Sequence, residues 1–387
     1  MRYKTLIFLG IGILIMGVMI YFIGFDEIVD AIKIANIYYI LLAIIVQIIT
    51  YYLFALRWKI MNKIANINIS IKKLIPMVLI GMAINNITPS GRGGGEPVKA
   101  YVLSKETDEA FETTFATVIG DRALDTIPFL ILAIITVILM IFSFNISYWI
   151  VNILIFGVFI VTIAFIILIY MSVNRKIAEK IITFVLRIIR IFYKKKQGTL
   201  EKTITKAIVG FQETMSLMLK DKNVLFKALP LSFLIWISEI LRVYIIFLAF
   251  GSQASPIIIA EVFIVATLLG MIPLLPGGLG IIDGMMILLF SAGGINPEIS
   301  AAATVIERLI SFWMTTFIGL ILLPYYGYSI TEKLTGEDIE DENELLEEII
   351  EDKDKIEEIF DKKDNETENK DKNENNENHE ESYNNEN

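Results

Sequence analysis

The chain alternates long apolar runs with short polar links, a pattern typical of membrane proteins. About 20 apolar residues in a helix cross the roughly 30 Å hydrocarbon layer of a bilayer. Six runs reach this length, so we predict about six full spans and an all-α, polytopic fold. The predicted spans cover residues 5–25, 37–56, 113–144, 147–171, 228–250 and 300–325.

Two further apolar segments are interrupted by glycine and proline, and we predict that they do not cross the membrane. These residues break a helix, and lipid offers no partner to the freed backbone groups. We therefore predict two re-entrant broken hairpins, over residues 74–106 and 256–292. Their breaks hold the candidate hinge or anion-binding positions Pro89, Gly91, Gly93, Gly94 and Gly95 in the first, and Pro276, Gly277, Gly278 and Gly280 in the second.

The basic residues predict the orientation of these segments. Residues 57–73 hold five Lys and Arg and residues 173–227 hold thirteen, so we place both loops in the cytoplasm. Three apolar segments lie between them, and an odd number of full spans cannot join two points on one side. The segment beside the glycines must then enter and leave by the same face. Continuing this reasoning, we predict a multi-pass protein of the cell membrane with both termini in the cytoplasm.

Composition separates the membrane part from a tail. Of the 387 residues, 55% are hydrophobic and the net charge is −9, yet residues 331–387 alone hold 24 acidic and 7 basic side chains. We predict a transmembrane domain over 1–330 and an acidic, largely disordered cytoplasmic tail over 331–387 that could bind a protein partner. The chain has no cysteine and its one histidine, His379, lies in the tail. We therefore predict no metal site and no cofactor.

Two parts of the sequence share one arrangement. Each has a proline in its glycine-rich break, a threonine 28 residues later, an acidic residue with an arginine, and an arginine in the preceding span. These are Pro89, Thr117, Asp121, Arg122 and Arg57 in the first part, and Pro276, Thr304, Glu307, Arg308 and Arg242 in the second. The similarity could be chance between Ile-rich segments. The alternative is a duplicated unit inserted in opposite orientations, an inverted repeat, with the substrate site between the copies.

Three motifs together resemble a known family: Pro89-Ser90-Gly91-Arg92 with Glu96-Pro97-Val98-Lys99, then Asp121-Arg122 with Asp125, and Pro276-Gly277-Gly278-Leu279-Gly280. The family is the flippase-like transmembrane domain of lysylphosphatidylglycerol synthases, which also occurs in stand-alone bacterial and archaeal membrane proteins. The resemblance covers residues 1–330 and implies a lipid-handling protein. Only a short acidic tail follows the last span, so the resemblance does not imply lipid lysylation, and we expect no enzyme. The first motif is richer in glycine than the family's Pro-x-Arg-x-Gly-Glu form, so its correspondence is approximate. The Ile-, Asn- and Lys-rich composition suits an archaeal source.

The charged residues of the predicted spans and hairpins are the candidate site. A phosphate that crosses hydrocarbon needs cations, and arginine binds it through paired hydrogen bonds. The candidate substrate-binding residues are Arg92, Glu96, Lys99, Asp121, Arg122, Asp125, Glu239, Arg242, Asp283, Glu307 and Arg308. Some could instead be structural ion pairs, since Arg122 and Asp125 are three residues apart on one helix. We expect Arg57 to be an interfacial anchor and Glu261 to be solvated.

These observations lead to a hypothesis of translocation or binding of a lipid or a polyprenyl-phosphate-linked substrate. The expected partners are membrane lipids or lipid-linked sugar phosphates, with no nucleic acid, and the protein could form an oligomer. Two alternatives stay open. One is a membrane-embedded enzyme that uses a lipid-linked donor, and the other is an accessory subunit of a lipid-modification or glycosylation complex.

Overall fold

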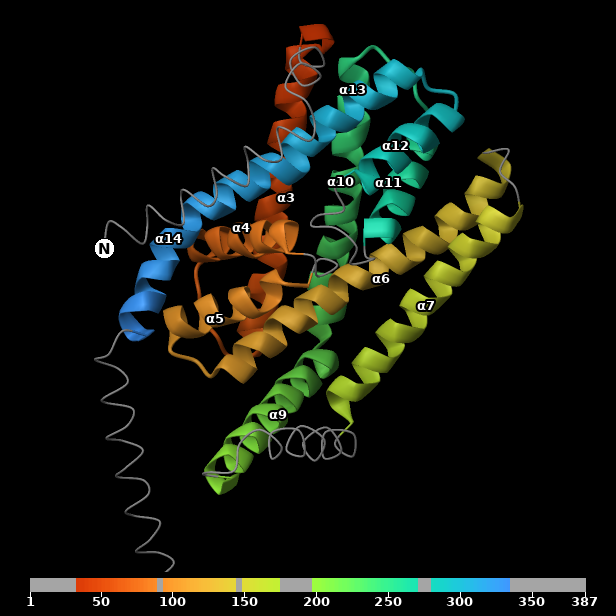
Figure 1. Ribbon diagram of the computed structural model, residues 1–387. Coiled ribbons are helices and arrows are strands. Elements are labelled where there is room, and N and C mark those ends of the chain that lie inside the picture. Colours follow the sequence, from red (N-terminus) through yellow and green to blue (C-terminus); the bar gives the residue numbers. More distant parts are fainter. Residues whose placement is uncertain (1–32, 89–92, 144–147, 175–196, 271–279, 335–387) are drawn as a thin grey trace, which may run out of the picture. The chain divides into compact units, whose positions relative to one another are not determined.

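The computed structural model describes residues 33–88, 93–143, 148–174, 197–270 and 280–334, and most of these residues are helical (Figure 1). Within this part of the chain, five helices are long and apolar enough to cross a membrane. They cover Ile37–Ile64, Phe111–Phe142, Asn152–Ser172, Val224–Ala249 and Pro297–Tyr326. The all-α, polytopic fold is therefore confirmed, with five of the six predicted spans. The sixth, over 5–25, lies outside the described residues.

The helices keep the order of the predicted segments. Their bounds are α3 Ile37–Ile64, α4 Ile71–Ile87, α5 Gly95–Thr107, α6 Phe111–Ser143, α7 Tyr148–Val173, α9 Gln197–Lys220, η1 Val224–Ala228, α10 Leu229–Ala249, α11 Pro256–Gly270, α12 Ile281–Ala292, α13 Pro297–Arg308, η3 Leu309–Met314 and α14 Thr315–Leu334. Both η1 and η3 are π-helical turns. Because η3 joins α13 to α14 directly, these three elements form one continuous helix with a π-helical turn in its middle.

The first broken segment is an antiparallel pair of helices, α4 and α5. Three contacts show that α4 and α5 run in opposite directions. Lys73 Nζ lies 2.5 Å from Glu106 at the outer ends, Gly81 lies against Lys99 midway, and the Gly95 N–H donates to Asn85 Oδ1 over 2.7 Å beside the break. The hydrogen bond that Lys73 donates to the Glu106 carboxylate raises the pKa of the exposed Lys73 ammonium.

Glycine allows this close approach, because a Cβ on Gly95 would come closer than 3.0 Å to the Gly81 backbone. At 17 and 13 residues, α4 and α5 are about 26 and 20 Å long, shorter than the hydrocarbon layer.

The second broken segment gives another pair of short helices, α11 and α12, of 15 and 12 residues, which pack on each other. The chain re-enters helix at Gly280, whose φ of +78° favours glycine. The carboxylate of Asp283 then accepts from the Gly280 N–H over 2.8 Å and caps the first turn of α12. The two hairpins are therefore confirmed as helix–break–helix units. The face by which each enters the membrane stays a prediction.

Reciprocal contacts between α3 and α10 agree with the predicted inverted repeat. Arg57 of α3 donates to Ser232 of α10 over 3.0 Å, and Arg242 of α10 donates to Gln47 of α3. The same nitrogen, Nη1, makes each bond. Since the C-terminal part of each helix meets the N-terminal part of the other, the helices run antiparallel. The predicted inverted repeat would relate α3–α6 to α10–α14 by a pseudo-two-fold axis between these two helices.

Other cross-contacts follow the same symmetry. The hairpin helix α11 packs on α6, the last long helix of the first repeat. The hairpin helix α4 lies along η3 and α14, where Asn86 Nδ2 donates to Thr316 over 2.8 Å and to the Phe312 carbonyl over 3.2 Å. A Cβ on Gly319 would come closer than 3.0 Å to Leu79 and Ala83 of α4. Each hairpin is thus held by the opposite repeat.

Helices α7 and α9 pack against α6 and lie outside the two repeats (Figure 1). The outer face of α7 exposes large apolar side chains such as Trp149, Phe156 and Phe159, as expected of a surface in contact with lipid. The inner face of α7 contributes Leu154 and Val158 to the buried core, which also joins α3, α6, α10, α11, α12 and α13. In this core the rings of Phe247 and Phe290 pack at 4.5 Å between centroids.

The chain divides into two compact units, Met1–Tyr326 and Gly327–Asn387. The first contains the first repeat and the second repeat as far as Tyr326. In the second, the described residues are 327–334, which belong to α14. The predicted disordered tail, 335–387, lies outside the described residues.

Candidate functional site

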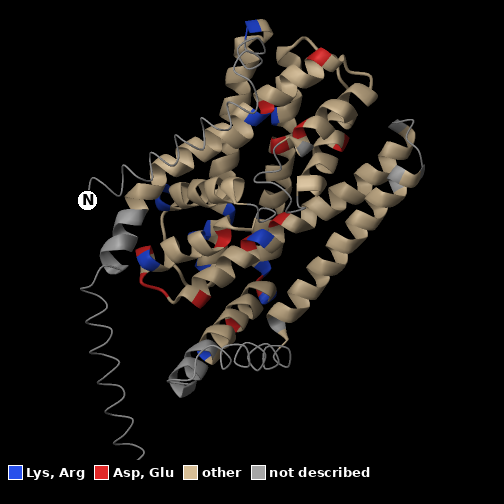
Figure 2. Cartoon of the chain, in the orientation of Figure 1, with Lys and Arg blue, Asp and Glu red and all other residues tan. Residues whose placement is uncertain are grey.

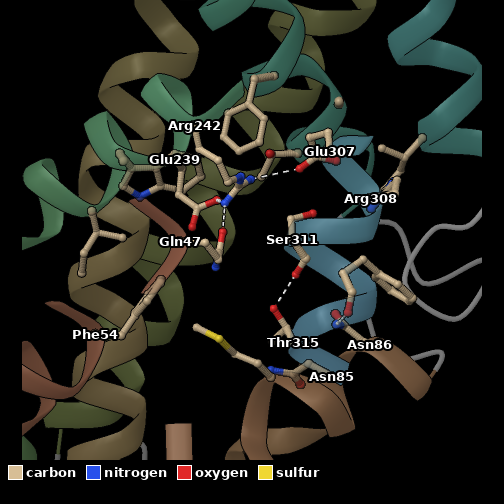
Figure 3. A pocket seen from close by; sticks show the side chains of 18 of the residues that line it. Gln47, Phe54, Asn85, Asn86, Glu239, Arg242, Glu307, Arg308, Ser311 and Thr315 are labelled. Carbon is tan, nitrogen blue, oxygen red and sulfur yellow. Dashed lines mark hydrogen bonds and ion pairs between the residues drawn. The ribbon is translucent and has the colours of Figure 1, made fainter. Parts of the chain in front are cut away.

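A cavity of about 200 Å³ lies where the two repeats meet (Figure 3). Charged residues from both repeats line it, namely Arg122, Asp125, Glu239, Arg242, Glu307 and Arg308. Neutral hydrogen-bonding residues add to the lining, among them Gln47, Asn85, Asn86, Thr267, Ser311 and Thr315. Phe54, Trp236 and Phe263 supply aromatic rings. Figure 2 shows few charged residues elsewhere along the long helices of the repeats.

The centre of the first repeat is Arg57, whose prediction as an interfacial anchor is wrong. The side chain is 1% exposed and lies inside the protein. Its Nε donates to Asp121 over 2.7 Å, and its Nη1 donates to Asp125 over 3.0 Å. A buried guanidinium is tolerated only when such partners offset the loss of water. The basic residues around Arg57 in the sequence concealed this role.

Arg122 of the first repeat is held more loosely. Its nitrogens lie 3.8 Å from Glu96 and 3.7 Å from Asp125, beyond ordinary hydrogen-bond length, and its side chain is 38% exposed. Lys99 lies behind this pair, with Nζ 3.8 Å from Asp121 and 4.4 Å from the centroid of the Trp58 ring. The ion pair expected between Arg122 and Asp125 is therefore present, but it leaves donors of Arg122 available to a ligand.

The centre of the second repeat is Arg242, which is also 1% exposed. Figure 3 shows its guanidinium among Gln47, Glu239 and Glu307. The ion pairs are 2.6 Å to Glu239 and 3.0 Å to Glu307. Beside this cluster, the Tyr51 hydroxyl forms a short hydrogen bond with Thr315. Glu239 and Arg242 thus pair as their three-residue spacing allows, and Glu307 joins them from another helix.

Arg308 is the tightly held counterpart of Arg122. Its Nε forms a short ion pair with Asp283 of α12, and its side chain is 9% exposed. Within the described part of the chain, its buried Nη2 has no hydrogen-bond partner. Within the same part of the chain, the buried Nε of Arg242 also has no hydrogen-bond partner. Buried donors without a partner are costly, and both arginines line the cavity, so these two nitrogens are candidate donors to a ligand there.

The two clusters share two corresponding ion pairs. Arg57 and Asp121 are separated by 64 residues, and Arg242 and Glu307 by 65. In both repeats, the next arginine pairs with an acidic residue at the start of the second hairpin helix. These pairs are Glu96–Arg122 and Asp283–Arg308. These shared contacts favour a duplicated unit over chance similarity of the repeated motifs.

Of the candidate substrate-binding residues, six line the cavity. Glu96, Lys99, Asp121 and Asp283 lie behind them as partners, and Arg92 lies outside the described residues. Pro89, Gly91, Pro276, Gly277 and Gly278 are also outside the described residues. The amides of Gly95 and Gly280 already donate to Asn85 and Asp283, and exposed Gly93 with Gly94 leads into α5. Within the described part of the chain, no group of three or more acidic or histidine side chains is placed to hold a metal ion.

Sequence reasoning missed the neutral part of the lining. No charge marks Gln47, Asn86, Ser311 or Thr315 within apolar runs, although a polar residue in a span is itself a signal of an internal face. The expectation for Glu261 is also wrong, because this residue is 1% exposed and lies inside the protein.

Comparison with known proteins decides the family. A family model described as the lysylphosphatidylglycerol synthase TM region matches residues 6–319. The chain belongs to this family. Its relatives include UPF0104 membrane proteins of archaea. One from Methanothermobacter thermautotrophicus is 50% identical over 334 residues, which cover 86% of this chain and 99% of the relative.

Two more distant relatives also match this chain along nearly their whole length. A UPF0104 membrane protein of Pyrococcus horikoshii is 32% identical over 83% of this chain and 96% of the relative. Another, from Methanocaldococcus jannaschii, is 31% identical over 85% and 97%. The expected family and the archaeal affinity are thus confirmed, and family membership agrees with a lipid-related role in the membrane.

Proposed function

We propose that this protein binds a lipid with a phosphate-bearing headgroup in the cavity between its repeats and moves that headgroup across the membrane. The observation that carries the proposal is the position of the cavity. It lies between two inverted repeats with broken hairpins, the arrangement that transporters use for substrates at the middle of the membrane. Membrane lipids or lipid-linked sugar phosphates are the proposed ligands, and no chemical step is proposed.

The charges of the two repeats supply a polar path for a headgroup. Gln47 and Arg57 of α3 belong to different clusters and are about ten residues apart, which corresponds to about 15 Å along the helix. The clusters thus cover about half the thickness of the hydrocarbon layer. A headgroup passing from one to the other stays in contact with hydrogen-bonding groups for most of the way.

The guanidinium groups account for the choice of phosphate. Arg122 is partly exposed, and Arg308 has a buried Nη2 without a partner among the described residues. Both line the cavity. Guanidinium donors match phosphate oxygens in geometry and bind them through charge-assisted hydrogen bonds. The acidic residues hold each arginine in place when the cavity contains no headgroup.

The test is translocation by the purified full chain in liposomes that contain fluorescent lipids. Phosphatidic acid, phosphatidylglycerol, a polyprenyl phosphate and uncharged diacylglycerol form the panel. We expect protein-dependent movement of at least one phosphate lipid and none of diacylglycerol. Arg122→Gln and Arg308→Gln should each slow lipid movement about tenfold or more, because each removes a charge-assisted hydrogen bond from the guanidinium to the phosphate.

Lys73→Gln is the matched control. Lys73 lies on α4 of the first hairpin, where it is 57% exposed and pairs with Glu106 away from the cavity lining. Its variant should move lipid at the normal rate. The proposal is overturned if folded wild-type protein neither binds nor moves any phosphate lipid of the panel, or if the three variants behave alike.

A further inference from the structure

The two repeats differ in the ion pair between the second hairpin helix and the arginine that follows it. Arg122 lies 3.8 Å from Glu96 and is 38% exposed, whereas Arg308 is bonded to Asp283 and is 9% exposed. By contrast, the central arginines of the two repeats are equally buried, at 1% each, and both are bonded to two carboxylates. The difference therefore lies in the outer ion pair of each repeat, where one pair is open and the other is closed.

Inverted symmetry gives this difference a meaning. Two repeats with the same contacts can exchange conformations, so an arrangement with the first pair open and the second closed implies a counterpart with the reverse. In the counterpart, Glu96 would close on Arg122 and Asp283 would release Arg308. The two arrangements are related by the axis between α3 and α10.

We propose that Arg122 and Arg308 are two equivalent phosphate-binding positions that hold the substrate phosphate in turn. This inference rests on the proposed function. In the arrangement described, the phosphate binds Arg122, because both carboxylates near that side chain are beyond hydrogen-bond length. After the exchange it binds Arg308, whose buried Nη2 then gains the acceptor that it lacks among the described residues. By the predicted topology, Arg122 is the cytoplasmic position and Arg308 the outer one.

The acidic partners act as competitors of the phosphate. A carboxylate and a phosphate bind the same guanidinium donors, so Glu96 and Asp283 each close a position that has no headgroup. Asp283→Asn keeps a side-chain oxygen that can cap Gly280, yet it removes the charge that holds Arg308. Glu96→Gln is the matched change in the pair that is already open.

The first experiment separates resting affinity from movement. Detergent-purified full chain is titrated with short-chain phosphatidic acid, with inorganic phosphate and with diacylglycerol. Arg122→Gln should weaken phosphatidic acid binding about tenfold or more. Arg308→Gln should leave this affinity within about twofold while abolishing movement in liposomes, because the loss falls on the second position only.

The outcomes of this experiment are distinct. Equal loss of resting affinity in both arginine variants overturns the alternation, even when wild-type protein moves lipid. Absence of binding and movement in folded wild-type protein overturns the proposed function itself. Binding of inorganic phosphate as tight as that of phosphatidic acid would mean a site for free phosphate, and that overturns the lipid assignment.

A second experiment reads the exchange directly. The chain has no cysteine, so single cysteines can be placed without removing any. Met82 of α4 and Met286 of α12 both line the cavity, and Met286 is 2% exposed. In otherwise unchanged protein, Met82→Cys should react with a membrane-impermeant maleimide faster than Met286→Cys. Asp283→Asn should raise labelling at Met286→Cys severalfold, and Glu96→Gln should not. Equal effects of these two acidic variants would contradict the exchange.

Discussion

Arg57→Met should destabilise the protein far more than the loss of an interfacial anchor from a basic stretch would. Arg57 is 1% exposed and makes three hydrogen bonds to carboxylates, two to Asp121 and one to Asp125. Without it, two carboxylates with side chains only 6% and 15% exposed lose their main partner. Breaking a buried ion pair in this way costs about 3–5 kcal/mol. Lys99, 3.8 Å from Asp121, is too distant to replace a bond of 2.7 Å.

The size of the loss depends on charge rather than on packing, and a combined variant separates the two. Methionine fills most of the volume of arginine, and asparagine keeps the shape of aspartate without its charge. Arg57→Met with Asp121→Asn and Asp125→Asn should therefore recover most of the stability, because no carboxylate is left unpaired. Replacing a whole buried ion cluster by neutral groups is often close to neutral for stability.

Equilibrium unfolding of detergent-solubilised protein by SDS, followed by the fluorescence of its four tryptophans, measures these differences. Lys73→Met is the control, since it breaks an exposed ion pair and should leave the midpoint unchanged. The reasoning is refuted if Arg57→Met shifts the midpoint no more than this control does. It is equally refuted if the triple variant is as unstable as Arg57→Met alone.

Two glycine changes test the close contacts of the first hairpin. Gly95→Ala should lower the melting temperature by several degrees, because the new Cβ comes closer than 3.0 Å to the Gly81 backbone. Gly284→Ala is the control. A Cβ at Gly284 has nothing within 4 Å, so this variant should not be destabilised in the same thermal scan. Gly319→Ala should also lower the melting temperature, because the new Cβ pushes α14 away from Leu79 and Ala83 of α4. Normal stability of this variant would show that α4 does not lie against α14.

Hydrophobic length predicted most of the fold, because the bilayer imposes it. A span needs about 20 apolar residues, and the five predicted spans among the described residues differ from the observed helices mainly at their ends. The breaks were predictable for the same reason, since glycine and proline cannot continue a helix in lipid. The packing of α4 on α14 was not, because a contact of Gly319 with Leu79 leaves no periodic signal in the sequence.

The site was predicted where charge interrupts an apolar run and missed elsewhere. Asp121 and Glu307 stand out within predicted spans, so the sequence identified them. Arg57 did not stand out, because Lys59 and Lys63 follow it and the group has the composition of an interfacial anchor. Only the repeat, in which Arg57 corresponds to Arg242, contained the information that it is buried.

The charge count of the two clusters leads to a last prediction. The first cluster has three cations and three carboxylates: Arg57, Lys99 and Arg122 with Glu96, Asp121 and Asp125. The second has two cations and three carboxylates: Arg242 and Arg308 with Glu239, Asp283 and Glu307. Lys99 follows Glu96 by three residues, and the residue three after Asp283 is Met286. The symmetry therefore identifies Met286 as the position of the missing cation.

Met286→Lys should fold, although this position is 2% exposed. A buried lysine is normally expensive, but Glu307 corresponds to the Asp121 carboxylate that lies 3.8 Å from Lys99. Phe290→Lys is the contrast on the same helix, since Phe290 is 0% exposed and packs on Phe247, so its variant should not give folded protein. Size-exclusion profiles and SDS unfolding would compare the two. If both fail equally, the symmetry does not extend to this position. If Met286→Lys folds, one carboxylate of the second cluster has no cationic side chain of the native cluster to neutralise it, and a group from outside the cluster must do so.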